Sequence, residues 1–591
     1  MQINTWLKGS FCGVMGLLLW SCSKEPVIDN TGTTTPGQTI STSYLNIRTD
    51  KAVYKPTETI QFTVDGNVPP TARVRYKQLT SVVDEAAITG NTWSWKAPGT
   101  DFTGYMVEVY GQESGQEKLY GTVAVDVSSD WSRFPRYGFL SKFGPLQEAD
   151  MDGVMATLTR YHMNGLQFYD WAEKHHKPLA GMVSMPATSW FDIANRPTSK
   201  ATVDGYIKRA HQKAMFALSY NLAYGALRDA EADGVKTEWS MYDDQSHVKR
   251  TVLDIGSFLK SPIYLMDPAN TNWQQYLAAR NSDMYSVYSF DGFHIDQLGD
   301  WGTKYSYSGQ PLNVAGSFGP FIQSMKAAHP DKRLVMNAVN QYGQQASIAH
   351  SPVDFLYTEV WSPNERYEDL GRIIQDNDAF GNGSKRTVLA AYMDYKAAEQ
   401  PGYFNPAGVL LTDAVIFAFG GSHLELGEHM LGKEYFPNAN LAMSDELKTS
   451  LIRYYDFLVA YQNLLRDGGT FNKPALLSAN PQISLANWPS QAGQLAVLGK
   501  EMKNQQILHL LNFTNTKTLD WRDAEGTKPK PDRIDKLDLV FTAPKAVKHI
   551  WFASPDWQGG RSQSIPFHQT GQRVTFTLPS LHYWDMVVIT Y

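Results

Sequence analysis

The sequence predicts a multidomain protein with a central (β/α)8 TIM barrel between two antiparallel β-sandwiches. Its 591 residues exceed what one hydrophobic core holds. Short segments of alternating apolar and polar residues, typical of antiparallel strands, occupy residues 44–128 and 469–591. Between them, strand-like segments alternate with longer amphipathic segments, which is the order expected of a parallel barrel.

The first 22 residues have the pattern of a lipoprotein signal. Lys8 precedes an apolar run at 11–20 that is too short to cross a membrane. The run ends in Leu-Trp-Ser-Cys, which resembles the bacterial lipobox, so we expect cleavage before Cys22 and lipidation of its thiol. This predicts an exported lipoprotein at the outer membrane or cell surface. A periplasmic or plainly secreted protein, or an uncleaved anchor, is the alternative.

Cys12 and Cys22 are the two cysteines of the sequence. After cleavage and lipidation we therefore expect no disulfide, no cysteine nucleophile and no cysteine-based metal site. Residues 23–43 are rich in Thr, Ser, Pro and Gly and have no apolar period, which predicts a flexible tether.

Residues 44–128 predict an immunoglobulin-like β-sandwich. Gly, Pro, Asn and Asp separate the alternating segments YLNIRTDKAVYKPTETIQFTVDG, ARVRYKQL, TWSWKA, GYMVEVYG and LYGTVAVDVS. We interpret this region as a structural or spacing module, with glycan binding as the minor alternative. Residues 469–591 predict a C-terminal β-sandwich from the segments QLAVLGKE, QQILHLLNFT, LDLVFTAP, AVKHIWFAS, RVTFTLPS and YWDMVVITY.

Residues 129–468 predict the barrel. Its strand candidates are YGFLSKFG from 137, NGLQFYDW from 164, AMFALSYNLAYG from 214, GFHIDQLG from 292, RLVMNAVN from 333, VDFLYTEVW from 353, RTVLAAYMDY from 386 and AVIFAFGGSHLELGE from 414. Helical segments lie between most of them, one opening at Asp150 and one following Ser444, whose side chain can cap it. Each strand candidate ends in polar or aromatic residues, and active sites of such barrels lie at the carboxyl ends of the strands.

Two of these strand ends carry an acid that suits catalysis. Strand alternation places His294 and Asp296 on the inner face of the fourth strand, and Phe293 and Ile295 on the helix-facing side. The same alternation places Glu359 near the inner end of the sixth strand. Two rim carboxylates suit cleavage of a glycosidic bond, because one attacks the anomeric carbon and the other donates a proton.

The remaining strand ends predict a sugar subsite. Carboxylates, amides and imidazoles bind vicinal hydroxyls, while Trp and Tyr rings stack on a sugar. The candidate substrate-binding residues are Tyr169, Asp170, Trp171, Tyr220, Asn221, His294, Asn337, Trp361, Tyr392, Asp394, His423 and Glu425. For any one of them, ordinary packing is an equal alternative, and for His294 the alternative is a hydrogen-bonded interior histidine. Asp300, between Gly299 and Gly302, is interpreted as a loop residue.

Composition and missing motifs argue against several other functions, namely nucleic-acid binding and catalysis with a metal or a cofactor. The net charge is −6 and no basic run occurs, which argues against nucleic acid as a partner. No HExxH, phosphate-binding glycine loop or GxSxG occurs, so no cofactor and no catalytic metal is expected. Two fragments, DMDG from 150 and DGVKTE from 233, faintly echo calcium loops and leave a structural calcium ion open. The oligomeric state stays open.

Four runs together resemble a known family. FPRYGFLSKFG, NGLQFYDWAEKHHKPL, GFHIDQLGD and YTEVWS are similar to glycoside hydrolase family 66, the dextranases and cycloisomaltooligosaccharide glucanotransferases. The resemblance implies a retaining enzyme on α-1,6-linked glucan, with Asp296 as nucleophile and Glu359 as general acid/base. Cyclising members carry a carbohydrate-binding module inserted late in the barrel, and here a short connection leaves no room for one.

The resemblance therefore implies an endo-acting dextranase on dextran and isomaltooligosaccharides. One alternative is a related enzyme that acts on short isomaltooligosaccharides or transfers glucosyl units. A second alternative is a surface glycan-binding protein without activity. For the retaining reading, the two carboxyl groups are expected roughly 5 to 5.5 Å apart.

Overall fold

The computed structural model describes residues 44–591. The predicted signal, Cys22 and the tether lie outside the described residues. Within the described part, none of the helices combines the length and apolarity that a membrane crossing requires.

The first part of the described chain is a pair of antiparallel sheets around one hydrophobic cluster. One sheet has the order β1-β2-β5 and the other β4-β3-β6-β7. Their strands are β1 (Asn46–Thr49), β2 (Thr59–Asp65), β3 (Arg73–Gln78), β4 (Ser81–Ala87), β5 (Thr92–Lys96), β6 (Thr103–Glu113) and β7 (Gln116–Val127). Phe62 of one sheet and Val74 and Val107 of the other meet in the cluster. The sequence did not predict β4, because all of its residues are exposed and show no apolar alternation.

Parallel strands follow in sequence order. A five-stranded sheet has the order β19-β18-β14-β9-β8, and a second parallel sheet has the order β20-β21-β23. The strands are β8 (Tyr137–Leu140), β9 (Gly165–Phe168), β14 (Phe216–Leu222), β18 (Gly292–Asp296), β19 (Arg333–Met336), β20 (Leu356–Glu359), β21 (Thr387–Ala390) and β23 (Ser422–His423). A parallel bridge between Asn337 and Tyr357 links β19 to β20. At the opposite edges of the two sheets, the Phe139 N–H of β8 donates to the carbonyl of Leu426, which follows β23, at 3.1 Å.

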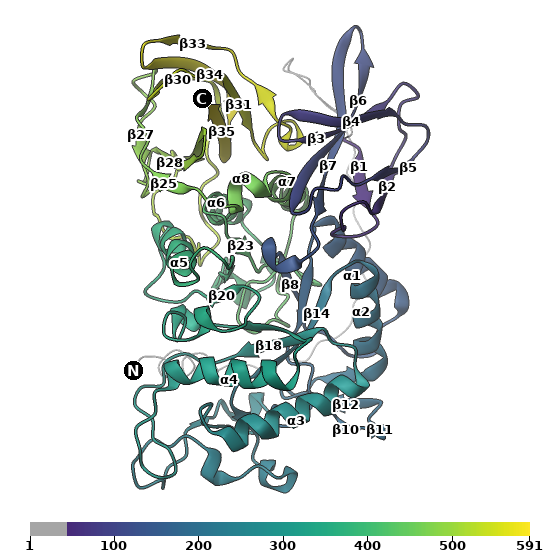
Figure 1. The fold of residues 1–591 in the computed structure, drawn as a ribbon, viewed down its shortest axis with the longest axis vertical. Helices are drawn as coiled ribbons and strands as arrows, with labels where there is room; N and C mark the ends of the chain where they lie inside the picture. Colours follow the sequence, from purple (N-terminus) through teal and green to yellow (C-terminus); the bar gives the residue numbers. More distant parts are fainter. Residues whose placement is uncertain (1–43) are drawn as a thin grey trace, which may run out of the picture. The chain divides into compact units, whose positions relative to one another are not determined.

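Helices cover these strands on the outside. They are α1 (Glu148–Arg160), α2 (Lys200–Gln212), α3 (Thr271–Val287), α4 (Val314–Ala328), α5 (Tyr367–Phe380), α6 (Pro406–Ala418), α7 (Asp445–Ala460) and α8 (Gln462–Arg466). Figure 1 shows α4 beside β18, and α3 packs on α4. Phe293 and Ile295 of β18 lie in one cluster with Phe318 of α4, which confirms the helix-facing side predicted from alternation. The predicted cap is also confirmed, since the Ser444 hydroxyl accepts from the Leu447 N–H at 3.2 Å.

The eighth strand prediction was wrong over most of its length. Residues 414–418 belong to helix α6, and the strand β23 covers Ser422–His423. All residues of α6 after Pro406 are buried, so this largely apolar helix has no exposed polar face that would reveal a helical period. A continuous apolar run does not distinguish a buried strand from a buried helix by its period.

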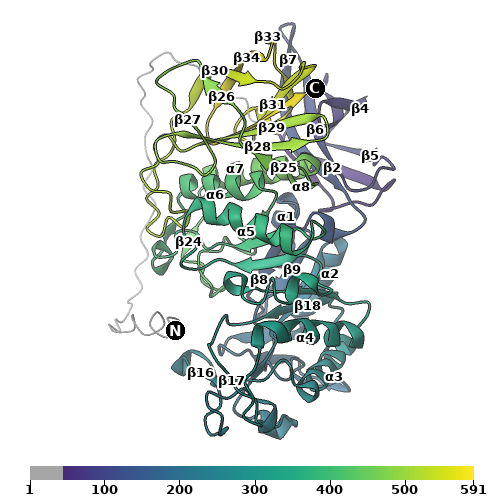
Figure 2. The same ribbon diagram turned by 60° about the vertical axis from the view of Figure 1, so that its left-hand side comes forward.

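The last part of the chain again forms two sheets around a hydrophobic cluster. One has the order β25-β28-β29-β35-β31-β32, with β27 on β28, and the other the order β26-β30-β34-β33. The strands are β25 (Thr470–Asn472), β26 (Leu476–Ser478), β27 (Leu485–Asn487), β28 (Leu495–Met502), β29 (Gln505–Asn512), β30 (Ile534–Thr542), β31 (His549–Ala553), β32 (Gln563–Ser564), β33 (Phe567–Thr570), β34 (Arg573–Leu581) and β35 (Trp584–Thr590). Figure 2 shows β28 and β29 next to α6 and α7. The architecture is multidomain and rich in sheet.

Short strands decorate the loops between the larger elements. They are β10 (Gly181–Met182), β11 (Met185–Pro186), β12 (Ser189–Phe191), β13 (Pro197–Ser199), β15 (Gly225–Ala226), β16 (Val252–Leu253), β17 (Ile263–Leu265), β22 (Gly402–Tyr403) and β24 (Leu441–Ala442). Between β21 and α6 the connection comprises residues 391–405 and holds β22 and one short 3-10 turn, Ala397–Glu399.

Candidate active site

Three neighbouring parallel strands end in polar side chains that meet one another. Asp296 is the last residue of β18, Asn337 follows the last residue of β19, and Glu359 is the last residue of β20. The Asn337 amide nitrogen donates to Asp296 Oδ1 at 2.8 Å and to Glu359 Oε2 at 3.0 Å. The two acids predicted from sequence are therefore brought together by one amide group.

The orientation of the Asn337 amide follows from its neighbours. Its Oδ1 accepts from the Glu359 backbone N–H at 3.2 Å, and a backbone N–H can only donate. The NH2 group must therefore point at the two carboxyl groups. The two oxygens that share this nitrogen lie no farther apart than the sum of 2.8 and 3.0 Å.

Asp296 is surrounded by donors. Its Oδ2 accepts from the Tyr220 hydroxyl at 2.5 Å, and its Oδ1 accepts from the Gln297 N–H at 2.8 Å as well as from Asn337. Burial raises the pKa of Asp296, while these three donors act in the opposite direction by stabilising the carboxylate. This donor set suits an ionised carboxylate.

Glu359 has fewer donors and lies beside the charge of Asp296. The Tyr392 hydroxyl donates to its Oε1 at 2.7 Å, and Asn337 is its second donor. Burial, followed by the negative charge of Asp296, raises the pKa of Glu359 to about 7. Near neutral pH Glu359 can therefore both hold a proton and release it, which is the property that an acid/base residue needs.

His294 lies below Asp296 on the inner face of β18. Its ring stacks between those of Tyr137 and Tyr220, with centroids 5.7 and 5.6 Å away, and its Nδ1 lies 3.2 Å from the Tyr137 hydroxyl. Burial lowers the pKa of His294 to about 3. His294 is thus a buried, hydrogen-bonded interior residue whose ring lies against that of Tyr220.

Three more predicted residues lie around the pair. The Tyr169 ring stacks on Phe436, 4.3 Å between centroids, and lies 4.8 Å from the Tyr220 ring. Burial raises the pKa of Asp170 to about 7, and Asp296 is close enough to add to that rise. On the other side, the partly exposed Trp361 ring lies 5.4 Å from that of Tyr392.

Trp171 and Asn221 do not join this group. Trp171 is fully buried in the hydrophobic core and donates to the Ser219 hydroxyl at 3.1 Å. Asn221 is buried, and both polar atoms of its side-chain amide bind His175. Its Oδ1 lies 2.7 Å from the ring Nδ1 of His175, and its Nδ2 donates to the His175 backbone carbonyl at 2.7 Å. Asn221 follows Tyr220 in β14, so strand alternation turns its side chain to the face opposite that of Tyr220, which binds Asp296.

Asp394, His423 and Glu425 are also placed elsewhere. Asp394 is buried and accepts from the Asn405 N–H at 2.5 Å. His423 lies 2.8 Å from Asp413, and Glu425 accepts from the Tyr455 hydroxyl at 2.9 Å. His423 ends the short strand β23 and Glu425 lies two residues beyond it, and neither side chain is hydrogen-bonded to Asp296 or Glu359.

Sequence reasoning missed two residues of the site. Glu434 lies on the loop between β23 and β24, and its carboxylate accepts from the Tyr395 hydroxyl at 2.7 and 2.9 Å. Its charge adds to the rise in the pKa of Glu359. Arg522 lies on the connection between β29 and β30, and its guanidinium packs 5.2 Å from the Trp361 ring. Neither residue lies on a periodic segment, so no pattern signalled them.

Two groups among the described residues have the spacing of metal ligands. In the first, His176, Asp229 and Asp233, the carboxylates already bind Lys174 at 2.6 and 2.8 Å. The second is the fully buried set of Asp413, His423 and Glu425. The calcium-like fragment from 150 lies inside helix α1, and Asp233 of the other fragment pairs with Lys174, so neither has the form of a calcium loop.

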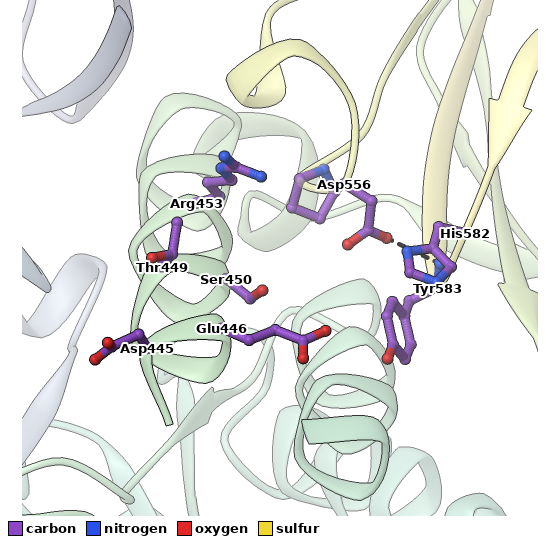
Figure 3. Close-up of a pocket in the computed structure, with 9 residues that line it drawn as sticks. Asp445, Glu446, Thr449, Ser450, Arg453, Asp556, His582 and Tyr583 are labelled. Carbon is purple, nitrogen blue, oxygen red and sulfur yellow. Dashed lines mark hydrogen bonds between the residues drawn. The ribbon is translucent and has the colours of Figure 1, made fainter. Parts of the chain in front are cut away.

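A separate cavity of about 430 Å³ lies between α7 and loops of the C-terminal sheets. Figure 3 shows Asp556 beside His582 and Tyr583, across from Glu446 and Ser450 of α7. None of its lining residues lies at the carboxyl end of a parallel strand. The acid pair therefore remains the candidate active site.

Comparison with known proteins gives consistent results. The chain is 27% identical to a cycloisomaltooligosaccharide glucanotransferase of Niallia circulans, over 92% of this chain and 72% of that protein. It is 24% identical to a dextranase of Streptococcus salivarius, over 83% of this chain and 68% of that protein.

A solved structure is also similar. The cycloisomaltooligosaccharide glucanotransferase of Paenibacillus sp., complexed with cycloisomaltoheptaose, has a TM-score of 0.85 at 26% identity, covering 92% of this chain and 99% of that chain. The sequence profile of glycosyl hydrolase family 66 matches residues 49–588. Because this profile spans the acid pair and the sheets on both sides of it, the chain belongs to glycosyl hydrolase family 66.

Proposed function

We propose that this protein is an endo-acting, retaining glycoside hydrolase that cleaves internal α-1,6-glucosidic linkages of dextran. The observation that carries the proposal is the shared Asn337 nitrogen, which keeps the facing oxygens of Asp296 and Glu359 within the sum of 2.8 and 3.0 Å. Retaining enzymes hold their carboxyl groups about 5 to 5.5 Å apart, whereas inverting enzymes need about 6.5 to 9.5 Å to fit a water between them.

The geometry supports a double displacement. The Asp296 carboxylate attacks the anomeric carbon and forms a glycosyl ester, while protonated Glu359 gives its proton to the glycosidic oxygen as the bond to the leaving sugar breaks. The Glu359 carboxylate then takes a proton from water, and the resulting oxygen attacks the anomeric carbon. The ester bond breaks, Asp296 leaves as a carboxylate, and Glu359 is protonated again.

The local electrostatics support this assignment of roles. Tyr220, Asn337 and the Gln297 N–H stabilise the charge that Asp296 needs for attack. The pKa of Glu359, raised to about 7 by burial and by the charge of Asp296, allows it to be an acid in one step and a base in the next.

The α-1,6-glucan as substrate is supported by the relatives. One is a dextranase, and another is a glucanotransferase whose structure holds a cyclic isomaltooligosaccharide. The rings of Tyr169, Trp361 and Tyr392 around the acid pair suit a sugar chain, since aromatic faces pack on sugar C–H groups.

Hydrolysis is favoured over cyclisation by the short connection at residues 391–405. The cyclising members to which the sequence is similar carry a carbohydrate-binding module in this part of the barrel. Transfer of glucosyl units to isomaltooligosaccharides is the second candidate, because two of the relatives reported above are glucanotransferases.

For the scaffold we propose a closed (β/α)8 barrel at 129–468, between an immunoglobulin-like sandwich and a C-terminal sandwich. The parallel order of β8, β9, β14, β18, β19, β20, β21 and β23 supports it. So do the Asn337–Tyr357 bridge and the Phe139 to Leu426 hydrogen bond, which join the two parallel sheets at both edges.

For the location we propose an exported lipoprotein held at a membrane through Cys22. The apolar run followed by a lipobox-like Cys22 supports this. Labelling of producing cells with a fatty acid should mark the wild-type protein and not Cys22→Ala. Equal labelling of the two would overturn the anchor.

The activity is tested by incubating the protein with dextran, starch and pullulan in parallel and sizing the products over time. We expect the viscosity of dextran to fall before small sugars accumulate, and no release from starch. Early release of small sugars alone would indicate exo action. Longer or cyclic products from isomaltooligosaccharides would favour the transferase, and no change in any substrate would favour a glycan-binding protein.

A further inference from the structure

A segment of the C-terminal part, residues 519–528, lies on the loops that follow β20 and β21. Its backbone binds them at four places. The Tyr367 N–H donates to the Leu519 carbonyl at 3.0 Å, and the Trp521 N–H donates to the Glu365 carbonyl at 3.0 Å. The N–H groups of Asp394 and Lys396 donate to the carbonyls of Arg522 and Ala524, at 2.9 and 2.8 Å. This segment is thus fixed against the carboxyl ends of two strands of the active site.

Arg522 of this segment reaches the residues next to Glu359. Its guanidinium donates to the Val360 carbonyl at 2.9 Å and to the Tyr392 carbonyl at 3.2 Å. Val360 directly follows Glu359, and Tyr392 is the residue whose hydroxyl binds Glu359 at 2.7 Å. One planar group therefore joins the ends of β20 and β21 on both sides of the Glu359 carboxyl.

The surroundings of Arg522 do not suit a simple ion-pair role. It is largely buried, and no ion pair involves it within residues 44–591. Burial lowers the pKa of Arg522, with acidic groups as weaker opposing influences. Its faces lie against the rings of Trp361, Tyr395 and Trp521, at 5.2, 5.4 and 4.5 Å. A buried cation held by carbonyls and rings positions those groups more than it contributes charge pairing.

We propose that Arg522 is a positioning residue for the acid/base, supplied to the active site by the connection between β29 and β30. It holds the Tyr392 backbone so that the hydroxyl stays on Glu359, and it holds the Trp361 ring at the edge of the site. The expected effect of Arg522 on kcat/KM rests on the proposed function. The expected effect on the distance from the Tyr392 hydroxyl to Glu359 does not depend on that function.

The same contacts explain Asp394. The Asp394 N–H donates to the Arg522 carbonyl, and the Asp394 carboxylate accepts from the Asn405 backbone N–H. The Asn405 side-chain nitrogen in turn donates to Asp523 at 2.8 Å. Asp394, which the sequence predicted to bind sugar, therefore helps to hold the segment that carries Arg522.

The test uses the full chain with Arg522→Gln, Arg522→Lys and the control Lys528→Met. Lys528 is a matched residue, because it is a buried cation of the same segment that donates to the Asp520 carbonyl at 2.8 Å and lies 5.1 Å from the Tyr367 ring. It is bonded to neither Val360 nor Tyr392. Removing it tests the packing of the segment without removing the contacts of Arg522.

The first readout is geometric and needs no substrate. In crystals of Arg522→Gln, the distance from the Tyr392 hydroxyl to Glu359 should lengthen from 2.7 Å to beyond hydrogen-bonding range. In crystals of Lys528→Met, the same distance should stay unchanged. If Arg522→Gln fails to fold, Arg522→Lys, which keeps the cation but lacks the planar fork, should show a smaller displacement in the same direction. An unchanged distance in the Arg522 variants overturns the proposal.

The second readout is a double-mutant cycle with Tyr392→Phe. Because Arg522 acts through Tyr392, we expect kcat/KM to fall on the order of tenfold in Arg522→Gln and little further in the double variant. Multiplying effects would contradict a role through Tyr392. If the wild type cleaves no α-1,6-glucan, the proposed function fails, whereas the crystal distances still decide the role of Arg522.

Discussion

Asp296 and Glu359 accept hydrogen bonds from the same atom, the side-chain nitrogen of Asn337, at 2.8 and 3.0 Å. Each acid ends its own strand, and Asn337 follows the strand between them. The register of β18, β19 and β20 thus sets the spacing of the acids without a direct contact between them.

Replacing Asn337 by Ala should lower kcat/KM by roughly 10²- to 10³-fold, the usual effect of losing one preorganised donor. Both carboxyl groups lose a donor to their charged forms, so both pKa values should rise further. Steady-state kinetics over pH measures this. Asn440→Ala is the control, because its amide binds the Ala398 carbonyl at 3.0 Å in a loop. Equal losses in the two variants would contradict a special role for Asn337.

The roles of the two acids are separable with azide. Asp296→Gly should lose activity by on the order of 10³-fold or more and, with added azide, form a glycosyl azide of inverted configuration. Glu359→Ala, given a substrate with a good aryl leaving group, should form the azide of retained configuration. NMR of the products reads the anomer. The opposite pairing of variants and anomers would reverse the roles.

Tyr392→Phe should move the alkaline limb of kcat/KM to higher pH. The Tyr392 hydroxyl stabilises the Glu359 carboxylate, so its loss raises the pKa of Glu359 beyond its value of about 7. With a higher pKa, Glu359 stays protonated up to a higher pH, although the maximal rate of the variant falls. An unshifted limb would mean that Glu359 is not the group that titrates there.

Glu434→Gln should move the same limb the other way. The negative charge of Glu434 contributes to the raised pKa of Glu359, so neutralising it lowers that pKa. The control is Glu399→Gln, an exposed acid that pairs with Lys433 at 3.4 Å. A limb that shifts equally in both variants would reflect general charge and not the position of Glu434.

Asp456→Asn should destabilise the protein by about 3 to 5 kcal/mol, since it leaves buried Arg160 without its partner. Burial acts to raise the pKa of Asp456, but Arg160 and His162 outweigh it and hold the pKa at about 2. The stabilisation is complete above the unfolded pKa of about 3.9 and is lost as pH falls toward about 2. Urea unfolding from pH 6 to pH 2 should show the two proteins converging. A constant gap would contradict the ion pair.

Alternation and strand ends supplied Asp296 and Glu359 as candidates from the sequence, and the resemblance to family 66 supplied the roles expected of them. The faces of His294, Asp296, Phe293 and Ile295 follow from a period of two, which is a local property of any strand. The helix after Ser444 was predicted for the same kind of reason, since capping and a 3.6-residue period are local.

The tertiary structure alone decided what each candidate does. Alternation could not show that Asn337 bridges the acids, because that depends on the register of three strands far apart in the chain. It also could not separate Tyr392, which binds Glu359, from Asp394, which binds Asn405. Glu434 and Arg522 lie on irregular segments, and long-range packing brings them to the site. Periodicity records which face a residue takes, whereas contacts between distant segments depend on the whole fold.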